Sequence, residues 1–429
     1  MKEYEIRDPV YGFIKFNGWE KEIIDHPIFQ RLRRIRQLAL TDMVYPGAMH
    51  TRFEHSLGVM HLATRMYDAI ISDNFNKQLL KEKLNYEAPG LQRDRQLVRL
   101  AALLHDVGHA PFSHASENIL KKNPKTKKHY KHEDYTTALI NGPLRDVIEK
   151  HSINRTNFNI TADDISGLIE GNPERLRERV FWKVIISSQL DADRGDYLLR
   201  DSYHSGVKYG IYDLDRLLVT IALGIDPETN DVILGVKEGG WHVAESLIIA
   251  RYLMFSQVYF HKTRRAYDYM LQEALKSTVE TLPSPNKIEA FLELDDYVMW
   301  HLMKNKNDNF WCNSIMTRNH LRRVYETGEF PTLEDEDTLD KIKAKLDFEG
   351  IWYLEDMAMN VWYKLNKDER GREEIMIIGR DKSTTPLLKY SRIVKNLGIS
   401  RQIRLYIKPK DRENAEKVIK GASNEGEHL

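Results

Sequence analysis

Cysteine is almost absent from this chain, because Cys312 is the only one among 429 residues. A single thiol cannot form a disulfide within the chain, which excludes a disulfide-stapled scaffold and favours a reducing compartment. The sequence also lacks a CxxC pair, a Walker-type glycine loop, an internal repeat and a low-complexity tract. Paired-thiol metal sites and P-loop nucleotide binding are therefore excluded as explanations of its function.

Net charge is also absent, since 64 Lys and Arg residues balance 64 Asp and Glu residues. This balance excludes a generally basic surface, so any anion site must be a local cluster of cations. The sequence has no patch in which aromatic and basic residues alternate, and we expect no nucleic-acid partner.

Long hydrophobic runs are missing. The most apolar long segment, residues 244–259, contains Glu245 and Arg251 and is shorter than a bilayer span. The N-terminal residues MKEYEIRDPV include no apolar stretch of the kind found in a secretory signal. We expect a soluble, cytoplasmic protein with no membrane partner.

The pattern of helices and strands predicts two parts. A hydrophobic core stops growing at about 250–300 residues, so this chain should form more than one lobe. Helical spacing dominates to about residue 285, where Pro283 and Pro285 interrupt it. Beyond this point charge increases, and residues 374–378 and 403–407 alternate as strands of one small C-terminal sheet. The fold class is therefore mainly α, with a helical core over 1–285 and a smaller α+β lobe over 286–429.

Arginines crowd one predicted helix that begins near Glu20. Its apolar residues recur at helical spacing through Leu38, and the arginines between them are Arg31, Arg33, Arg34 and Arg36. Such a run is usual for a solvated helix face, but it could also contact phosphate or a partner subunit.

The stretch LVRLAALLHDVGHAPFSH, residues 97–114, carries the densest group of titratable side chains. Leu97, Leu100 and Leu104 follow helical spacing, and Gly108 ends the helix. The pair His105 and Asp106 follows the helix directly. Imidazole and carboxylate are usual metal ligands, although an isolated pair could instead cap the helix.

Two further segments decide between these interpretations: TRFEHSLG at 51–58 and LDADRGDY at 190–197. With DPVYGFI, FQRLRRIRQL and HDVGHAPFSH, they resemble the HD-domain superfamily of metal-dependent phosphohydrolases. More narrowly, the first three-quarters of the chain is similar to the deoxynucleoside triphosphate (dNTP) triphosphohydrolases, including the vertebrate members that join a sterile alpha motif to an HD domain. The resemblance implies a helical HD-domain core, with the HD motifs within 50–200.

The resemblance implies a single divalent metal site. Its ligands would be His55, His105, Asp106 and Asp193. Asp191, the other carboxylate of the Asp-x-Asp pair, would orient a ligating histidine. The donor set accepts Mg, Mn, Fe or Zn, and the sequence leaves the metal open.

A second group of residues follows the HD pair and could move a proton. Imidazole titrates near neutral pH, and an adjacent carboxylate fixes its tautomer. By resemblance, His114 and His132 lie beside the α-phosphate with Glu133 alongside, and Glu117 stands where the relatives have Asp. The predicted catalytic residues are His109, His114, Glu117, His132 and Glu133.

The resemblance also implies residues that contact the dNTP. Arg52 and Arg194 match positions that contact phosphate, and Lys262 and Arg265 are further cations near the motifs. The remaining residues would select the sugar and base: Gln37 and Asp201 bind the 3′-hydroxyl, Leu38 and Tyr267 exclude a 2′-hydroxyl, Tyr197 lies nearby, and Asp268 replaces a Gln near the base.

A second nucleotide site is implied at a subunit interface. Three residues match positions that bind an activating guanine nucleotide such as GTP or dGTP: Asp25, Gln30 and Arg33. Three more match a segment that contacts the activator phosphates from a neighbouring chain: Arg318, Asn319 and Arg322. We expect a homo-oligomer, a dimer or tetramer, with the C-terminal lobe in its interface. Alternatively, these arginines only hold the oligomer together.

The leading functional prediction is a metal-dependent enzyme that hydrolyses dNTPs to deoxynucleoside and inorganic triphosphate. One alternative is a nucleotidase or phosphodiesterase on the same scaffold, because a fold alone does not define a substrate. Another is a nucleotide-sensing module with incidental hydrolysis. Identification of the released phosphate species separates the enzymes, and survival of nucleotide binding after loss of His105 and Asp106 would favour the sensor.

Overall fold

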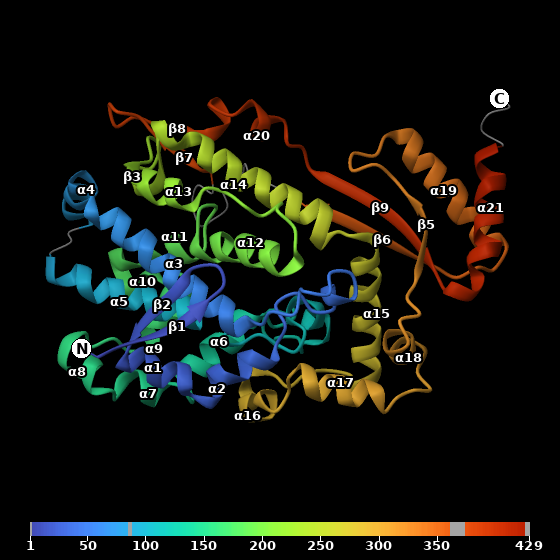
Figure 1. Ribbon diagram of the computed structural model, residues 1–429, viewed down its shortest axis with the longest axis horizontal. Helices are drawn as coiled ribbons and strands as arrows, with labels where there is room; N and C mark the ends of the chain where they lie inside the picture. The colour runs from blue at the N-terminus through green and yellow to red at the C-terminus, as the bar shows by residue number, and fades with distance from the viewer. Residues whose placement is uncertain (1, 85–87, 361–373, 425–429) are drawn as a thin grey trace. The chain divides into compact units, whose positions relative to one another are not determined.

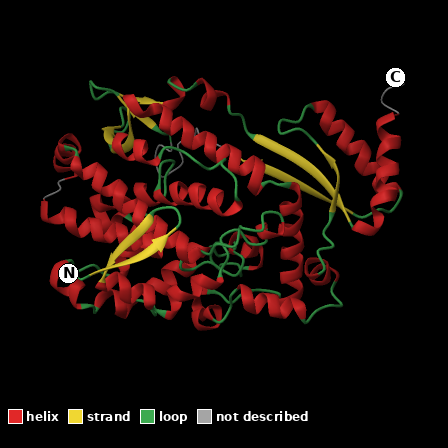
Figure 2. Ribbon diagram, in the orientation of Figure 1, coloured by secondary structure: helices red, strands yellow, loops and turns green. Residues whose placement is uncertain are grey.

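The computed structural model describes residues 2–84, 88–360 and 374–424, and these are mainly helical, as predicted (Figures 1 and 2). The chain divides into two compact units. The first comprises Met1–Met254, Thr281–Val298 and Tyr363–Asn396, and the second comprises Phe255–Glu280, Met299–Trp362 and Leu397–Leu429. The units thus alternate along the chain, in contrast to the single boundary predicted at residue 285.

The first unit is built from short and medium helices with two small sheets. Its helices are α1 (Gly18–Asp25), α2 (Pro27–Gln30), α3 (Arg52–Ser72), α4 (Asn74–Leu84), α5 (Ala88–Leu104), α6 (His132–Asn141), α7 (Arg145–Glu149), α8 (Ser152–Asn157), α9 (Ala162–Glu170), α10 (Pro173–Leu176), α11 (Lys183–Ile186), α12 (Ala192–Ser205), α13 (Leu214–Thr220), α14 (Trp241–Met254), α16 (Ile288–Leu292) and α20 (Arg392–Asn396). Its strands are β1 (Glu3–Asp8), β2 (Gly12–Asn17), β3 (Ile221–Ile225), β4 (Val232–Lys237), β7 (Met376–Ile378) and β8 (Thr384–Pro386).

The second unit combines helices with one three-stranded sheet of order β5-β9-β6. Leu405 of this sheet and Leu346 belong to its apolar core. The elements are α15 (Lys262–Val279), α18 (Phe310–Met316), α19 (Leu333–Phe348), α21 (Arg412–Asn424), β5 (Arg322–Glu326), β6 (Tyr353–Asn360) and β9 (Ser400–Ile407), together with most of α17 (Asp296–Lys304).

Helices α3, α5 and α12 carry the predicted metal ligands or lie directly before them. Helix α3 packs against both α5 and α12. Helix α5 ends at Leu104, as its apolar spacing predicts, and Leu97, Leu100 and Leu104 are fully buried. A capping box between Thr51 and Glu54 starts α3. The buried faces of these helices therefore anchor the segments that carry the ligands.

Two glycines permit close approach beside these segments. A Cβ atom added to Gly58 of α3 would lie 2.7 Å from Cγ of Asp196 on α12. A Cβ atom added to Gly108 would lie 2.7 Å from Oγ1 of Thr136 on α6. A side chain at either position would force the neighbouring helix away.

The arginine-rich segment is not the single helix that its spacing predicts. Helix α1 ends at Asp25, His26 is extended, and Pro27 begins the separate helix α2. The reason is the proline, which disfavours a helical residue before it and lacks an N–H. A 3-10 turn, η1 (Arg31–Arg34), follows. The arginines therefore do not share one helical face.

Arg31 also contradicts the interpretation of this segment as solvated, since it is 1% exposed. Its guanidinium donates to the carbonyl oxygens of His109, at 2.9 Å, and Leu294, at 2.6 Å. Buried polar groups of this kind are normally fully bonded. Arg31 thus fixes the loop that follows the HD pair.

The two C-terminal strand predictions fall in different sheets. Strand β7 pairs in parallel with β4, within a sheet of order β3-β4-β7-β8 in the first unit. Strand β9 pairs antiparallel with β5 and β6 in the second unit. The strands themselves are confirmed, but the prediction of one shared sheet is wrong, because alternation along a strand does not specify its partner.

Within the described residues, the structure has no helix that is both long and apolar enough to cross a bilayer.

Candidate active site

Four predicted metal ligands meet in the first unit. Nε2 of His55 lies 3.1 Å from Oδ1 of Asp193 and 3.5 Å from Oδ2 of Asp106. Nε2 of His105 lies 3.3 Å from Oδ1 of Asp106 and 3.8 Å from Oδ1 of Asp193. Segments more than a hundred residues apart in the sequence thus bring two imidazoles and two carboxylates together.

Each ligand histidine has its Nδ1 atom occupied by a partner. Nδ1 of His105 lies 2.8 Å from the carbonyl oxygen of Ala102, and Nδ1 of His55 lies 2.8 Å from Oδ2 of Asp196. A hydrogen bond from Nδ1 leaves Nε2 as the ligand atom and sets the ring orientation. Both rings therefore present the same atom to the centre.

The orienting carboxylate is Asp196, whereas the sequence pattern suggested Asp191. Oδ1 of Asp191 accepts the backbone N–H of Arg194 at 2.7 Å and caps α12, and its carboxylate also pairs with the Arg194 side chain. Asp196 is one turn further along the helix, where it faces α3. The prediction for Asp191 is wrong because a helix N-cap binds its own backbone first.

Charge at this centre is strongly coupled. Burial lowers the pKa of His55, but the carboxylates of Asp106, Asp193 and Asp196 more than offset it and hold this pKa well above its ordinary value. Burial raises the pKa of Asp193, whereas the neighbouring imidazoles lower it far below its ordinary value. A proton on His55 thus balances the carboxylates, and a cation in the centre would replace that proton.

The donor set fits a divalent metal ion. The Nε2 atoms of His55 and His105 are buried and lack a hydrogen bond of acceptable geometry within the described chain. Ligand atoms of His55, His105 and Asp193 all lie within 4.8 Å of one another. Buried imidazole nitrogens that point at carboxylates without bonding well are expected where an ion completes the coordination.

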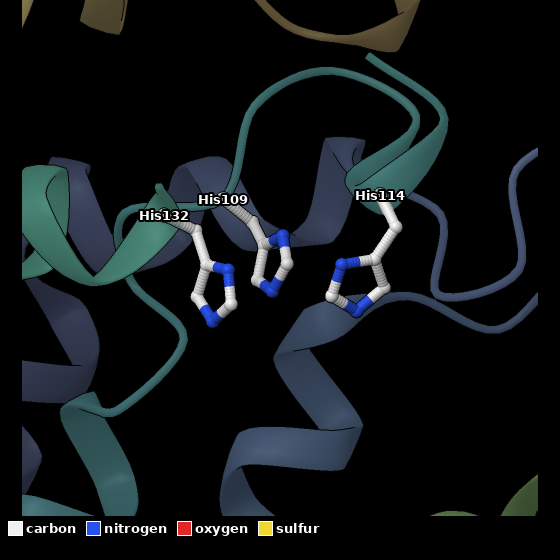
Figure 3. Close-up of side chains that lie close together, drawn as sticks. All are labelled: His109, His114 and His132. Atoms are coloured by element: carbon white, nitrogen blue, oxygen red, sulfur yellow. The ribbon is translucent and has the colours of Figure 1, made fainter. Parts of the chain in front are cut away.

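A second cluster adjoins the first and consists of three histidines. Figure 3 shows the rings of His109, His114 and His132 side by side. The rings of His109 and His132 stack with centroids 4.0 Å apart, and Nε2 of His109 lies 3.4 Å from Oδ1 of Asp106. Asp106 therefore faces both the ligand histidines and this second cluster.

The carboxylates beside the three histidines are Glu117 and Glu133. Nδ1 of His114 lies 2.7 Å from Oε1 of Glu117, and Nδ1 of His132 lies 3.4 Å from Glu133 and 3.6 Å from Glu117. All five predicted catalytic residues thus lie together. The His114 side chain is 63% exposed, whereas His109 is buried. An imidazole held by a carboxylate yet open to solvent can meet a ligand.

The pKa values separate the three imidazoles. Burial, then Arg52 and His132, depress the pKa of His109 well below its ordinary value, so this ring is neutral. Burial lowers the pKa of His132, but Glu117 and other carboxylates more than offset it and raise this pKa. One neutral and one cationic ring in a stacked pair offer different donors to an anion.

Arg52 bridges the two clusters. Its guanidinium pairs with Asp106, and its Nε donates to Oγ of Ser113 at 2.9 Å. Ser113 and the preceding Phe112 both have positive φ values, 55° and 59°. The backbone N–H of Phe112 donates to Oδ1 of Asp296 at 2.7 Å. These bonds hold an unfavourable backbone conformation and aim the loop toward Arg52.

The predicted sugar residues of the first unit are buried or half-buried. Gln37 is 8% exposed, and its Oε1 has no hydrogen-bond partner within the described residues. Leu38 is buried beside it. Oδ1 of Asp201 lies 2.7 Å from Nε2 of His50, and burial raises the pKa of Tyr197 to about 12, so its hydroxyl stays protonated. Buried acceptors and donors of this kind suit a hydroxyl-bearing ligand.

The other predicted phosphate and base residues have protein partners. Arg194 bonds Asp191 and the carbonyl oxygen of Ser188. In the second unit, Nε of Arg265 donates to Asp356 at 3.1 Å. Two residues there are buried, with Asp268 3.7 Å from Arg264 and Tyr267 5.3 Å from the ring of His320, and Lys262 lines a cavity with Arg322.

The residues predicted to bind an activator belong to both units. In the first unit, Nε of Arg33 donates to Oε1 of Gln30 at 2.8 Å, and Asp25 pairs with Lys21. In the second unit, Arg318 has a positive φ of 57° and the Arg322 guanidinium contacts His320. Asn319 donates its backbone N–H to Ser314 at 2.8 Å. Each half of this predicted site is described by itself.

Sequence reasoning missed three supporting residues: Asp196, His50 and Asp296. Asp196 lies three residues after Asp193 on α12, so helical spacing could have placed it beside the ligand. His50 and Asp296 are each at least 150 residues from a partner that they hold. No local signal identifies such contacts.

Comparison with known proteins gives consistent matches. Residues 52–181 match the HD domain family, and residues 213–349 match the HD associated region. The uncharacterized protein YwfO of Bacillus subtilis is 34% identical, over 96% of this chain and 93% of its own. A protein named deoxynucleoside triphosphate triphosphohydrolase SAMHD1 homolog, from Dictyostelium discoideum, is 30% identical over 70% of this chain.

Structural comparison agrees. The crystal structure of a hypothetical protein from Aquifex aeolicus has a TM-score of 0.78 and 28% identity, and covers 97% of this chain and 100% of its own. The chain spans 55% of the length of the Dictyostelium protein and 65% of the uncharacterized protein MJ1154 from Methanocaldococcus jannaschii. Together with the His, His-Asp, Asp ligand arrangement, these matches show that the chain belongs to the HD-domain family of phosphohydrolases.

Proposed function

We propose that the protein hydrolyses dNTPs to a deoxynucleoside and inorganic triphosphate. Water attacks the α-phosphorus, the bond from this phosphorus to the 5′-oxygen breaks, and a proton passes to the leaving 5′-oxygen. The observation that carries the proposal is the position of Asp106, which faces both the metal donor set and the cluster of histidines. A phosphate held between the two would meet a cation and a proton donor at once.

His55, His105, Asp106 and Asp193 would hold the ion. A divalent ion bound there withdraws charge from a phosphate oxygen and so favours attack by water. Arg52 supplies a fixed guanidinium beside Asp106, where it can bind a second phosphate oxygen. Neutral His109 donates a hydrogen bond, whereas cationic His132 stabilises negative charge that grows on the α-phosphate.

His114 is the best-supported proton donor for the leaving 5′-oxygen. Its Nδ1 lies 2.7 Å from Glu117, which orients the ring, and its side chain is open to solvent. Burial raises the pKa of Glu117, but His114 and His132 more than offset this and hold it far below its ordinary value. Glu117 therefore stays ionised and supports the protonated form of His114.

Selection of deoxyribose is supported by Gln37, Leu38 and Asp201. Oε1 of Gln37 is a buried acceptor that lacks a partner in the described chain, and a 3′-hydroxyl would supply one. Leu38 offers an apolar surface that would reject a 2′-hydroxyl. His50 holds Asp201 by a 2.7 Å contact, which suits a second bond to the 3′-hydroxyl.

The direct test is product identification. Purified protein is incubated with each dNTP and each ribonucleotide, with Mg or Mn, and products are separated by ion-exchange chromatography. Inorganic triphosphate and deoxynucleoside are expected from dNTPs, with no turnover by a protein that carries both His105→Ala and Asp106→Ala. Release of phosphate or pyrophosphate would instead support the nucleotidase alternative, and tight nucleotide binding that survives both substitutions would support the sensor.

Activation by GTP or dGTP, assembly into a homo-oligomer and a cytoplasmic location stay predictions that accompany this proposal. The single cysteine supports the reducing compartment. Resemblance at the two groups of predicted activator residues supports activation. Hydrolysis with and without GTP, together with mass measurement by light scattering under both conditions, tests activation and assembly at once.

A further inference from the structure

A cavity of about 220 Å³ in the second unit has a lining that is almost entirely basic. The side chains of Lys262, Arg322, Arg323 and Arg412 are cationic, and no carboxylate belongs to the lining. The remaining lining residues are Thr263, His320, Leu321 and Tyr406. Sequence reasoning assigned Lys262 to the substrate and Arg322 to an activator, yet both line this one cavity.

The positive charge is only partly neutralised. Arg412 donates to Oε1 of Glu416 at 2.7 Å, and Arg323 shares Glu326 with Arg404. Among the described residues, no carboxylate lies within ion-pair distance of Lys262 or Arg322. Cations gathered without counter-charges repel each other, and a bound anion would remove that cost.

The backbone adds to this field. Lys262 and Thr263 form the first turn of the 18-residue helix α15, whose positive end therefore lines the cavity. The hydroxyl of Tyr406 donates to the carbonyl oxygen of Lys262 at 2.7 Å and fixes this turn. Burial, then Arg322, lower the pKa of His320 to about 4, so its ring is neutral and does not add a further cation.

Size restricts the ligand. Sites for drug-sized ligands usually enclose about 300–1,000 Å³, so a cavity of about 220 Å³ is too small for a whole nucleotide. It matches a compact, multiply charged anion that several cations contact at once.

We propose that this cavity binds an oligophosphate chain, either free inorganic triphosphate or the phosphate tail of a nucleotide whose base and sugar remain outside. All the lining residues come from one chain and one unit, so the site requires no partner subunit. Free triphosphate is also a product of the proposed reaction, and binding here would report its concentration to the second unit; this last point rests on the proposed function.

The test is calorimetric titration of sodium triphosphate into the full chain after metal depletion with a chelator. Depletion removes the contribution of a metal centre to phosphate binding. The variants are Lys262→Gln and Arg322→Gln, since neither breaks an ion pair with a described carboxylate and both should fold. Lys341→Gln, on the exposed face of α19, is the matched control for loss of one charge.

Saturable binding by the wild type and the control, weakened about tenfold or more in each pocket variant, would support the site. Parallel titrations with pyrophosphate and GTP identify the source: equal affinity for triphosphate and GTP indicates recognition of the chain alone, and a preference for GTP indicates a nucleotide tail. Absence of saturable binding by the wild type, or unchanged affinity in both pocket variants, would overturn the proposal. Because turnover is not measured, this result is independent of whether dNTPs are hydrolysed.

Discussion

Asp196→Asn should weaken metal binding although Asp196 is not a ligand. Its Oδ2 lies 2.8 Å from Nδ1 of His55 and also accepts from Nε of Arg200 at 2.8 Å. An asparagine can present its amide N–H₂ to His55, which would favour the wrong tautomer. Loss of such a supporting carboxylate typically lowers metal affinity about 10- to 100-fold, or about 1.4–2.8 kcal/mol.

The assay is titration of Mn²⁺ or Zn²⁺ into metal-depleted protein, with urea unfolding measured in parallel. Asp8→Asn is the matched control, because Asp8 holds Nη1 of the same Arg200 at 2.8 Å but does not contact His55. Both variants disturb a buried guanidinium and should unfold at lower urea. Only Asp196→Asn should also bind metal more weakly.

Equal metal affinity in Asp196→Asn and wild type would refute the role of Asp196. Equal weakening in Asp8→Asn and Asp196→Asn would refute it differently, since the effect would then arise from Arg200 and general loosening of α12. Circular dichroism of both variants checks that each protein is folded when the metal is added.

Further predictions concern proton competition and buried polar groups. Because neighbouring carboxylates raise the pKa of metal-free His55, metal must displace a proton, and affinity for Mn²⁺ should rise between pH 6 and pH 8 by up to about tenfold per unit; calorimetry in both buffers checks this. Glu20→Gln should lower the free energy of unfolding by about 3–5 kcal/mol in urea, because buried Arg99, 2.6 Å from Glu20, loses its counter-charge; an unchanged midpoint would contradict this. Asp296→Asn should cost about 1–3 kcal/mol by the same measurement, since one of two buried backbone N–H groups loses its acceptor, and a smaller change would show that water replaces it.

The metal ligands could be predicted from the sequence for a physical reason. His105 and Asp106 follow an apolar helix whose spacing marks its buried face, and the motifs around His55 and Asp193 recur in related proteins. The boundaries of α5 and the strand character of β7 and β9 also follow from local spacing. What local patterns determine was thus correctly predicted.

The missed features all depend on contacts between distant residues. The buried state of Arg31 depends on a carbonyl 263 residues away, and periodicity cannot show such a partner. Strand partners were misassigned because alternation specifies a face and not a neighbour. The interleaving of the two units likewise depends on where the chain returns.

Gly58 and Gly108 have a consequence for how this centre can change. Each carries only a hydrogen where a neighbouring helix passes, so even a single methyl group would have to displace a whole segment. Metal coordination tolerates distance errors of only about 0.2 Å. Natural variation can therefore exchange many residues around the ion, whereas a carbon atom gained at either glycine would separate the parts that must close on it.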